Sequence, residues 1–299
     1  MKILTGTGVA LTTPFTANHE VDALALTALV NHCIDGSIDY LVVHGTTAEP
    51  SSLTSDEKQW VTDTVISANA GRLPLVLGVG GNNTAEVVKS LREVDVNTFS
   101  AILSVSPYYN KPTQEGIYRH FREIALNSPL PIIVYNVPGR TSSNIEPETL
   151  VRLAEEFPNI VAVKEASGNL VQVMEIIAKK PKRFHVISGD DITALPTVLA
   201  GGSGVISVLG QAVPQLFSKM IHLGLSGENK EAFHIHYKLQ DLMGLIFEEG
   251  NPAGIKAMLQ ELGIGTAEVR LPLVECSKGL REKIHGAMHP LHLQQAVKV

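Results

Sequence analysis

Lys164 directly follows a short apolar segment, an unusual place in a sequence for a charged side chain. Residues 160–163 are all apolar, and turn-forming residues flank this region at 158–159 and 168–169. A short, continuous apolar run is typical of a parallel strand that is buried on both faces. Burying an unpartnered ammonium group is costly, so burial would favour the neutral amine, a nucleophile toward carbonyl carbon. The alternative is a lysine at a frayed strand end whose head group reaches water.

Other apolar runs lead into further side chains that suit carbonyl chemistry. These side chains are Thr46, Thr47, Tyr109, Tyr135 and Arg140. Hydroxyl groups move protons between reaction steps, and the planar fork of arginine suits a carboxylate. Each type also has an ordinary structural use, because threonines brace turns, tyrosines pack in cores and arginines lie on surfaces. Asp, Glu and His form no group with ligand spacing near these runs, so we expect no metal site.

A repeated pattern of strand and helix provides a common frame for these residues. The apolar runs are residues 9–11, 40–43, 75–77, 101–103, 132–135, 160–163, 185–187 and 205–206. The amphipathic segments between and after them are residues 21–34, 55–69, 84–94, 113–126, 147–156, 170–179, 191–199 and 214–225. Eight repeats predict an α/β fold, a closed (β/α)8 TIM barrel whose functional residues lie where strands end. A doubly wound sheet is the alternative, but no nucleotide-binding fingerprint follows the first strand.

The alternation ends near residue 225, and the rest of the chain is predicted to be helical. Residues 230–247, 252–262 and 273–285 have helix-like patterns, and no apolar strand separates them. The sequence therefore predicts a catalytic barrel of residues 1–225. It also predicts a C-terminal helical extension of residues 226–299, which acts as a lid, an interface or both.

The composition is that of a globular protein without a nucleic-acid or membrane partner. The 299 residues are 44% hydrophobic, and 24 Lys and Arg against 30 Asp and Glu give a net charge of -6 without a basic tract. Cys33 and Cys276 are the only cysteines, both in helix-like segments, which implies no disulfide framework and a reducing compartment. The N-terminus lacks the apolar core of a signal peptide, and no apolar stretch is long enough to cross a bilayer. We therefore expect a cytoplasmic protein.

Several motifs, in this order, resemble the pyruvate-dependent class I aldolases of the dihydrodipicolinate synthase family. They are Gly-Val-Ala-Leu-Thr-Thr-Pro-Phe at 8–15, Gly-Thr-Thr-Ala-Glu at 45–49, Pro-Tyr-Tyr-Asn-Lys-Pro at 107–112, Tyr-Asn-Val-Pro-Gly-Arg-Thr at 135–141 and Val-Lys-Glu-Ala-Ser-Gly at 163–168. The resemblance implies a Schiff-base-forming lyase that condenses pyruvate with L-aspartate 4-semialdehyde to 4-hydroxy-tetrahydrodipicolinate, in lysine and diaminopimelate biosynthesis. It implies no external cofactor, because an imine on the lysine acts as the electron sink.

The resemblance also implies roles for individual residues. Lys164 forms the imine with pyruvate, Tyr135 carries protons beside it, and Thr46 relays protons between Tyr135 and Tyr109. An adjacent subunit donates Tyr109, and the family is commonly a homotetramer, a dimer of dimers. The implied substrate-binding residues are Thr47 in the pyruvate pocket, Arg140 at the carboxylate of the aldehyde, and Gly189 and Ile206 in the pocket wall.

A possible effector site for lysine follows from the same resemblance. Its residues are Pro50, Ser51, Lys58, Asn82, Glu86 and Tyr108. Pro50 lacks a backbone donor, and Lys58 replaces a histidine of some lysine-sensitive members, so its charge would repel the ammonium groups of lysine. We therefore expect weak or absent inhibition by lysine, and strong inhibition at low lysine concentration in a titration would contradict this. Ala48 replaces the usual glycine, which predicts strain if this position needs a positive φ.

Two other functions remain open from the sequence. Another aldolase of this family, which cleaves N-acetylneuraminate or a 2-keto-3-deoxy sugar acid, would use the same Lys164 and Tyr135. Arg140, between Gly139 and Thr141, favours an aldehyde that carries a carboxylate. A barrel that binds a 2-keto acid as a sensor without catalysis is the third reading, and the complete set of Lys, Tyr, Thr and Arg argues against it.

Overall fold

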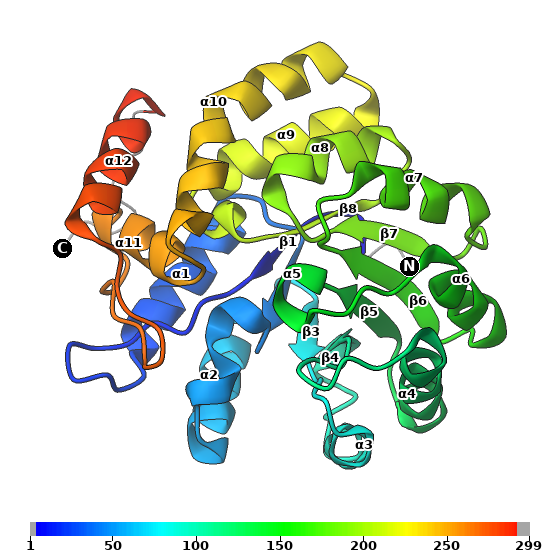
Figure 1. The fold of residues 1–299 in the computed structure, drawn as a ribbon. Coiled ribbons are helices and arrows are strands. Elements are labelled where there is room, and N and C mark those ends of the chain that lie inside the picture. Colours follow the sequence, from blue (N-terminus) through cyan, green and yellow to red (C-terminus); the bar gives the residue numbers. More distant parts are fainter. Residues whose placement is uncertain (1–3, 292–299) are drawn as a thin grey trace.

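Eight parallel strands close into a barrel in the order of the sequence (Figure 1). The structure is a computed structural model that describes residues 4–291. Residues 1–3 of the predicted barrel and residues 292–299 of the predicted extension lie outside the described residues. The strands are β1 (Gly6–Ala10), β2 (Tyr40–Val43), β3 (Leu75–Gly78), β4 (Phe99–Val105), β5 (Ile132–Asn136), β6 (Ile160–Glu165), β7 (His185–Ser188) and β8 (Gly204–Ser207). The predicted TIM barrel is confirmed, although the first strand begins at Gly6 rather than at Val9.

A helix follows each strand and packs on the outside of the barrel (Figure 1). These helices are α1 (Ala23–Asp35), α2 (Ser55–Asn69), α3 (Thr84–Leu91), α4 (Gln114–Asn127), α6 (Pro147–Glu156), α7 (Leu170–Lys179), α8 (Asp191–Leu199) and α9 (Pro214–Ser226). Local sequence fixes where they begin. At α2, for example, the Thr54 hydroxyl accepts from the Glu57 backbone N–H while the Glu57 carboxylate accepts from the Thr54 N–H, a capping box.

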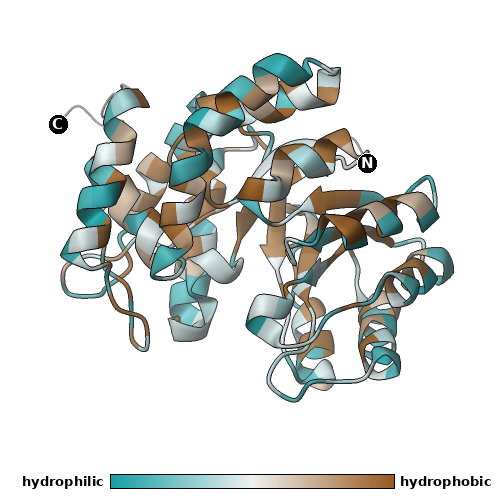
Figure 2. Ribbon diagram, turned by 45° about the horizontal axis from the view of Figure 1, so that its top comes forward, coloured by the Kyte–Doolittle hydropathy of each residue, from teal (hydrophilic) through white to brown (hydrophobic). Residues whose placement is uncertain are grey.

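Alternate residues of each strand point into the barrel and out toward the helices. In β2, Val42 belongs to the apolar cluster inside the barrel, and Val43 packs with the helices outside. In β6, Ala162 belongs to the inner cluster, and Val163 packs outside. Since side chains alternate with a period of two, Lys164 is on the inward face with Ala162. Figure 2 shows the strands as the most hydrophobic elements, whereas the helices carry a hydrophobic face and a hydrophilic face.

As far as Leu291, where the described part of the chain ends, the extension has three α-helices that share the barrel's hydrophobic core. They are α10 (Asn229–Glu248), α11 (Ala253–Glu261) and α12 (Lys278–Met288). One cluster of buried apolar side chains runs from Val9 in β1 to Met288 in α12, and Figure 1 shows α11 and α12 beside α1. Within residues 4–291, the structure contains no helix long and apolar enough to span a membrane.

The predicted helix of residues 273–285 is wrong in its first part. Residues 273–277 are not helical, because α12 begins after Ser277, whose hydroxyl accepts from the Leu280 backbone N–H as an N-cap. Cys276 therefore lies in a connecting segment and not in a helix as predicted, whereas Cys33 does lie in α1. Both cysteines are buried free thiols.

Candidate active site

Lys164 and Tyr135 lie side by side on the inner wall of the barrel. The pairing of β5 with β6 places Tyr135 opposite Lys164, and the lysine Nζ is 4.3 Å from the centre of the tyrosine ring. Lys164 is only 4% exposed, so the alternative of a head group that reaches water is wrong. Among residues 4–291, no carboxylate forms an ion pair with Lys164. A buried lysine without a carboxylate partner has the environment expected of an amine nucleophile.

Gly189 and Ile206 lie on the wall around this lysine. A Cβ atom at Gly189 would be 2.9 Å from Cε of Lys164 and 2.6 Å from Cβ of Ala166, so only glycine leaves room for the lysine stem. Ile206, in β8, belongs to the same inner cluster as Tyr135. The structure therefore brings Lys164 together with Tyr135 and Gly189, and Ile206 lies on the same inner face of the barrel.

Replacement of Gly189 by alanine is expected to displace Lys164 and to lower kcat/KM of a reaction that uses this lysine by roughly 10- to 100-fold. The reason is that small misplacements of a reacting group have effects of this size. Steady-state kinetics measures the change, with Gly244→Ala as the matched control. Gly244 lies in α10 with open space around its Cα, so the added methyl group meets nothing within 4 Å. Equal kinetics for the two variants would contradict the assigned contact.

The loop after β2 carries the two predicted threonines. Thr46 and Thr47 begin a short 3-10 helix, η2 (Thr46–Ala48), and Thr47 is buried whereas Thr46 is half-buried. The strain expected at Ala48 is absent, because the left-handed conformation falls on the next residue, Glu49, with φ of 54°. The Thr13 hydroxyl donates to the Ala48 carbonyl at 2.8 Å and braces the same turn.

Asn251 connects Thr47 with Arg140 and was not predicted from the sequence. Its side-chain N–H donates to the Thr47 hydroxyl at 3.0 Å, and its backbone carbonyl accepts from Arg140 Nη2 at 3.3 Å. The Oδ1 atom of Asn251 is buried and has no hydrogen-bond partner among the described residues. Asn251 follows α10, about 200 residues after Thr47 in the chain. The only local signal was an Asn-Pro pair before a helix, which is common at helix starts.

Arg140 lies on the short helix α5 (Pro138–Thr141), directly after β5. Its side chain is exposed, and the bond to Asn251 uses one of the five N–H donors of a guanidinium group. The remaining donors suit a bidentate contact with a carboxylate from solution. The exposure of Arg140 agrees equally with an ordinary surface arginine, but its bond to Asn251 links it through that residue to Thr47.

Glu165 provides a rigid polar support behind Lys164. Its buried carboxylate accepts from the Asn136 amide at 2.9 Å, the Gln172 amide at 3.0 Å and the Ser167 backbone N–H at 2.8 Å. Asn136 and Glu165 follow Tyr135 and Lys164 in the two strands and are paired in register. A fully bonded network in a buried position restricts the ends of β5 and β6 and therefore the two reactive side chains.

The half-buried His44 and the buried Asp191 lie where other strands end, and both are held by the fold. Burial lowers the pKa of His44 to about 4, and its Nε2 lies 2.9 Å from the Thr62 hydroxyl. Burial raises the pKa of Asp191 to about 6, although its carboxylate accepts from the Leu209 backbone N–H at 2.7 Å. Each group is bonded to structural partners, so we assign neither to the chemistry.

Tyr109 is not brought to the lysine within a single chain. It is 89% exposed and has a left-handed backbone, with φ of 72°. Of the predicted effector residues, Asn82 and Tyr108 are in contact, since the Asn82 amide donates to the Tyr108 carbonyl at 3.2 Å. The other four lie on three elements, Pro50 and Ser51 on the 3-10 helix η3 (Pro50–Ser52), Lys58 on α2 and Glu86 on α3.

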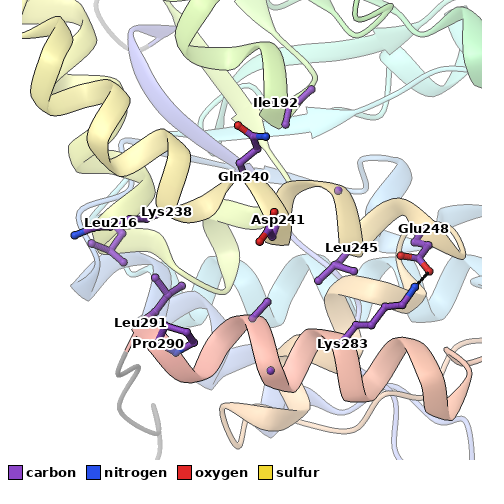
Figure 3. A pocket seen from close by; sticks show the side chains of 13 residues that line it. Ile192, Leu216, Lys238, Gln240, Asp241, Leu245, Glu248, Lys283, Pro290 and Leu291 are labelled. Atoms are coloured by element: carbon purple, nitrogen blue, oxygen red, sulfur yellow. Dashed lines mark hydrogen bonds and ion pairs between the residues drawn. The ribbon is translucent and has the colours of Figure 1, made fainter.

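One hollow on the surface lies away from the predicted site residues. It has a volume of about 1090 Å³ and lies between α10 and α12, with Ile192 of α8 at its edge (Figure 3). The Lys283–Glu248 ion pair joins the two helices there. None of the predicted catalytic or binding residues lines this hollow. Within residues 4–291, no group of three or more His, Cys, Asp and Glu side chains is placed to hold a metal ion.

The profile of the Dihydrodipicolinate synthetase family matches residues 3–290. The chain belongs to this family. It is 55% identical to 4-hydroxy-tetrahydrodipicolinate synthase of Flavobacterium psychrophilum over 95% of this chain and 97% of the relative.

Solved structures of the Dihydrodipicolinate synthetase family have the same fold. The chloride-inhibited dihydrodipicolinate synthase from Acinetobacter baumannii complexed with pyruvate is 36% identical, with a TM-score of 0.92 over 96% of this chain and 98% of that one. A structure described as the first monomeric dihydrodipicolinate synthase variant is 34% identical, with a TM-score of 0.93 over 96% of each chain.

Proposed function

We infer that the protein is a lyase of the class I aldolase type that condenses pyruvate with L-aspartate 4-semialdehyde. The product is 4-hydroxy-tetrahydrodipicolinate, on the route to diaminopimelate and lysine. Identity over almost the full length with relatives named 4-hydroxy-tetrahydrodipicolinate synthase supports this activity. The single structural observation that carries it is the buried Lys164, which lies beside Tyr135 on the inner wall and has no carboxylate partner among the described residues. An assay with pyruvate and aspartate 4-semialdehyde tests it, with N-acetylneuraminate as the competing substrate.

In the proposed mechanism, Lys164 forms a covalent imine with pyruvate. The neutral amine adds to the ketone carbon, and loss of water gives an iminium ion that withdraws electrons from the methyl group. Loss of a methyl proton gives an enamine, whose carbon attacks the aldehyde of the second substrate. The amino group of that substrate then attacks the imine carbon, which closes the ring and releases the Lys164 amine. We propose that this chemistry needs no external cofactor.

We propose Tyr135 as the group that carries protons to and from these intermediates. The contact between its ring and the Lys164 Nζ supports this role. Thr46 is the proposed relay from Tyr135 to a second tyrosine, and Thr47 the proposed contact for pyruvate. Both threonines lie on one turn, and the Thr47 hydroxyl is held by Asn251.

We propose that Tyr109 completes the relay of a neighbouring subunit in a homotetramer, a dimer of dimers. Two observations support this proposal. The tyrosine is almost fully exposed on its own chain, and its left-handed backbone is an unfavourable conformation of the kind found at functional sites. We also propose a cytoplasmic location, with which two buried free thiols are compatible.

Arg140 is the proposed partner for the carboxylate of aspartate 4-semialdehyde. Replacing it with methionine is expected to raise KM for the aldehyde by roughly 30-fold or more, because the loss of a charged hydrogen-bonding partner costs about 2–5 kcal/mol. The rate of imine formation with pyruvate should stay within about twofold. Initial rates over a range of aldehyde concentrations measure the first effect, and reductive trapping of pyruvate measures the second.

Arg140→Lys serves as the matched variant, since it keeps the charge without the planar fork. Its KM for the aldehyde should lie between those of the unmodified protein and Arg140→Met. An unchanged KM for the aldehyde in Arg140→Met would contradict the assignment. If the unmodified protein cleaves a sugar acid and does not act on aspartate 4-semialdehyde, the alternative function as a sugar-acid aldolase is favoured.

A further inference from the structure

A buried ion pair joins the extension to the loop that carries the two threonines. Lys256 of α11 donates to Oε1 of Glu49 at 2.5 Å, and the two side chains are 1% and 2% exposed. Lys256 also donates to the Glu268 carbonyl at 2.9 Å. The second carboxylate oxygen of Glu49 accepts from the Arg270 backbone N–H at 3.0 Å. Both oxygens of Glu49 are therefore held by residues of the extension.

The side chain of Arg270 extends this contact along the same loop. Its guanidinium group donates to the Ser52 carbonyl at 2.9 Å and forms an ion pair with Glu57 at 2.5 Å. The ring of Phe15 lies beneath both cations, 4.0 Å from Lys256 Nζ and 4.4 Å from the centre of the Arg270 guanidinium. We call Glu49, Lys256 and Arg270 the clamp.

Stability alone gives a weak reason for such a buried pair. Apolar side chains of similar volume often stabilise a fold as well as a buried ion pair does, because the charges lose their hydration. In agreement, burial lowers the pKa of Lys256 to about 8, although the nearby Glu49 carboxylate favours the charged form. The pair instead fixes the orientation of the Glu49 carboxylate, because each of its two oxygens accepts from a donor at a set position.

Glu49, which Lys256 and Arg270 hold, has an unfavourable backbone conformation. Glu49 is left-handed, with φ of 54°, and it directly follows the turn of Thr46 to Ala48. A left-handed residue other than glycine costs of order 1–3 kcal/mol and persists only where its surroundings hold it. The clamp supplies that restraint, while Asn251, five positions before Lys256, holds the Thr47 hydroxyl.

We propose that Lys256 is a positioning residue for the reaction. With Glu49 and Arg270 it fixes the Thr46–Ala48 turn, so that the threonine hydroxyls keep the orientation that proton relay and pyruvate binding require. The part of the extension that carries Lys256 and Arg270 is thus a necessary part of the active site. This inference rests on the proposed function, because it assumes that the two threonines act on the pyruvate imine.

The test compares full-length variants in kinetics, thermal unfolding and borohydride trapping of pyruvate. The main variant is the double substitution Glu49→Gln with Lys256→Met, which removes both charges together and leaves no buried charge unpaired. The second variant, Arg270→Lys, keeps the charge but loses the fork that contacts Ser52 and Glu57. The matched control is Lys283→Met, which removes the exposed ion pair between α10 and α12 and lies far from the loop in sequence.

The double variant is expected to keep its cooperative unfolding and to become trapped on Lys164 at saturating pyruvate. Its kcat should fall and its KM for pyruvate rise, lowering kcat/KM by roughly 10- to 100-fold relative to Lys283→Met. If the double variant fails to fold, the kinetics of Arg270→Lys test the proposal, and its kcat/KM for pyruvate is expected to fall by about 3- to 10-fold. Kinetics equal to those of the control in the folded clamp variants would overturn the proposal. An absence of trapping in the unmodified protein would instead refute the proposed function, and the positioning role with it.

Discussion

Replacing Lys164 with methionine is expected to lower turnover by at least about 10⁴-fold, because losing a covalent nucleophile removes the reaction path and not merely a contact. Methionine fills a similar volume without a charge, and Lys164 is buried with no carboxylate partner within residues 4–291. The variant should therefore fold, and its Tm should be no lower than that of the unmodified protein. Turnover of pyruvate with aspartate 4-semialdehyde measures the loss, and thermal unfolding measures the fold.

Lys182→Met is the matched control for this substitution. Lys182 is exposed and precedes β7, so it lies at the end of the barrel opposite the strand ends that carry the site. This variant should keep full activity. Turnover of Lys164→Met within tenfold of the control would mean that another group forms the imine or that no imine forms.

Replacing Tyr135 with phenylalanine is expected to reduce kcat by about 10²- to 10⁴-fold, the usual contribution of a general acid or base. The ring, and with it the packing against the Lys164 Nζ and the inner cluster, is retained. Imine formation should still occur, but more slowly, since the amine remains in place while proton transfer is impaired. Rapid-mixing kinetics with borohydride quenching separates the two effects.

The control for the tyrosine is Tyr118→Phe in α4. The Tyr118 hydroxyl donates to Glu156 on the outside of the barrel, so its loss removes a phenol that has no part in the site. Activity of Tyr118→Phe should be unchanged. A Tyr135→Phe variant with the same kcat as Tyr118→Phe would exclude Tyr135 as the proton carrier.

The barrel and its lysine were predictable because they depend on local patterns. Each strand is a short apolar run and each helix an amphipathic segment, so their order alone gives the (β/α)8 topology. In β6, the same regularity fixes the inward direction of Lys164, two residues after Ala162. Gly189 and Ile206 came from the family resemblance; Gly189 lies against the lysine stem and Ile206 belongs to the inner cluster, while their roles in substrate binding stay a prediction.

The contacts between the extension and the barrel were not predictable from such patterns. Lys256 lies in a segment that reads as an ordinary amphipathic helix, and its partner Glu49 is more than 200 residues earlier. The hydrophobic periodicity of a segment reports its local structure and cannot reveal a pairing over that distance. The same holds for Asn251 and Thr47, while the error at Cys276 arose because an apolar segment can pack as an extended connection as well as a helix.

The central claim is that Lys164 forms an imine with pyruvate, and reductive trapping tests it most directly. The protein is incubated with pyruvate, reduced with borohydride, digested and analysed by mass spectrometry, with a sample reduced without pyruvate as the control. We predict one modified peptide, which contains Lys164 and carries the mass of a reduced pyruvyl group. An unmodified Lys164, or modification of other lysines alone, would contradict the account.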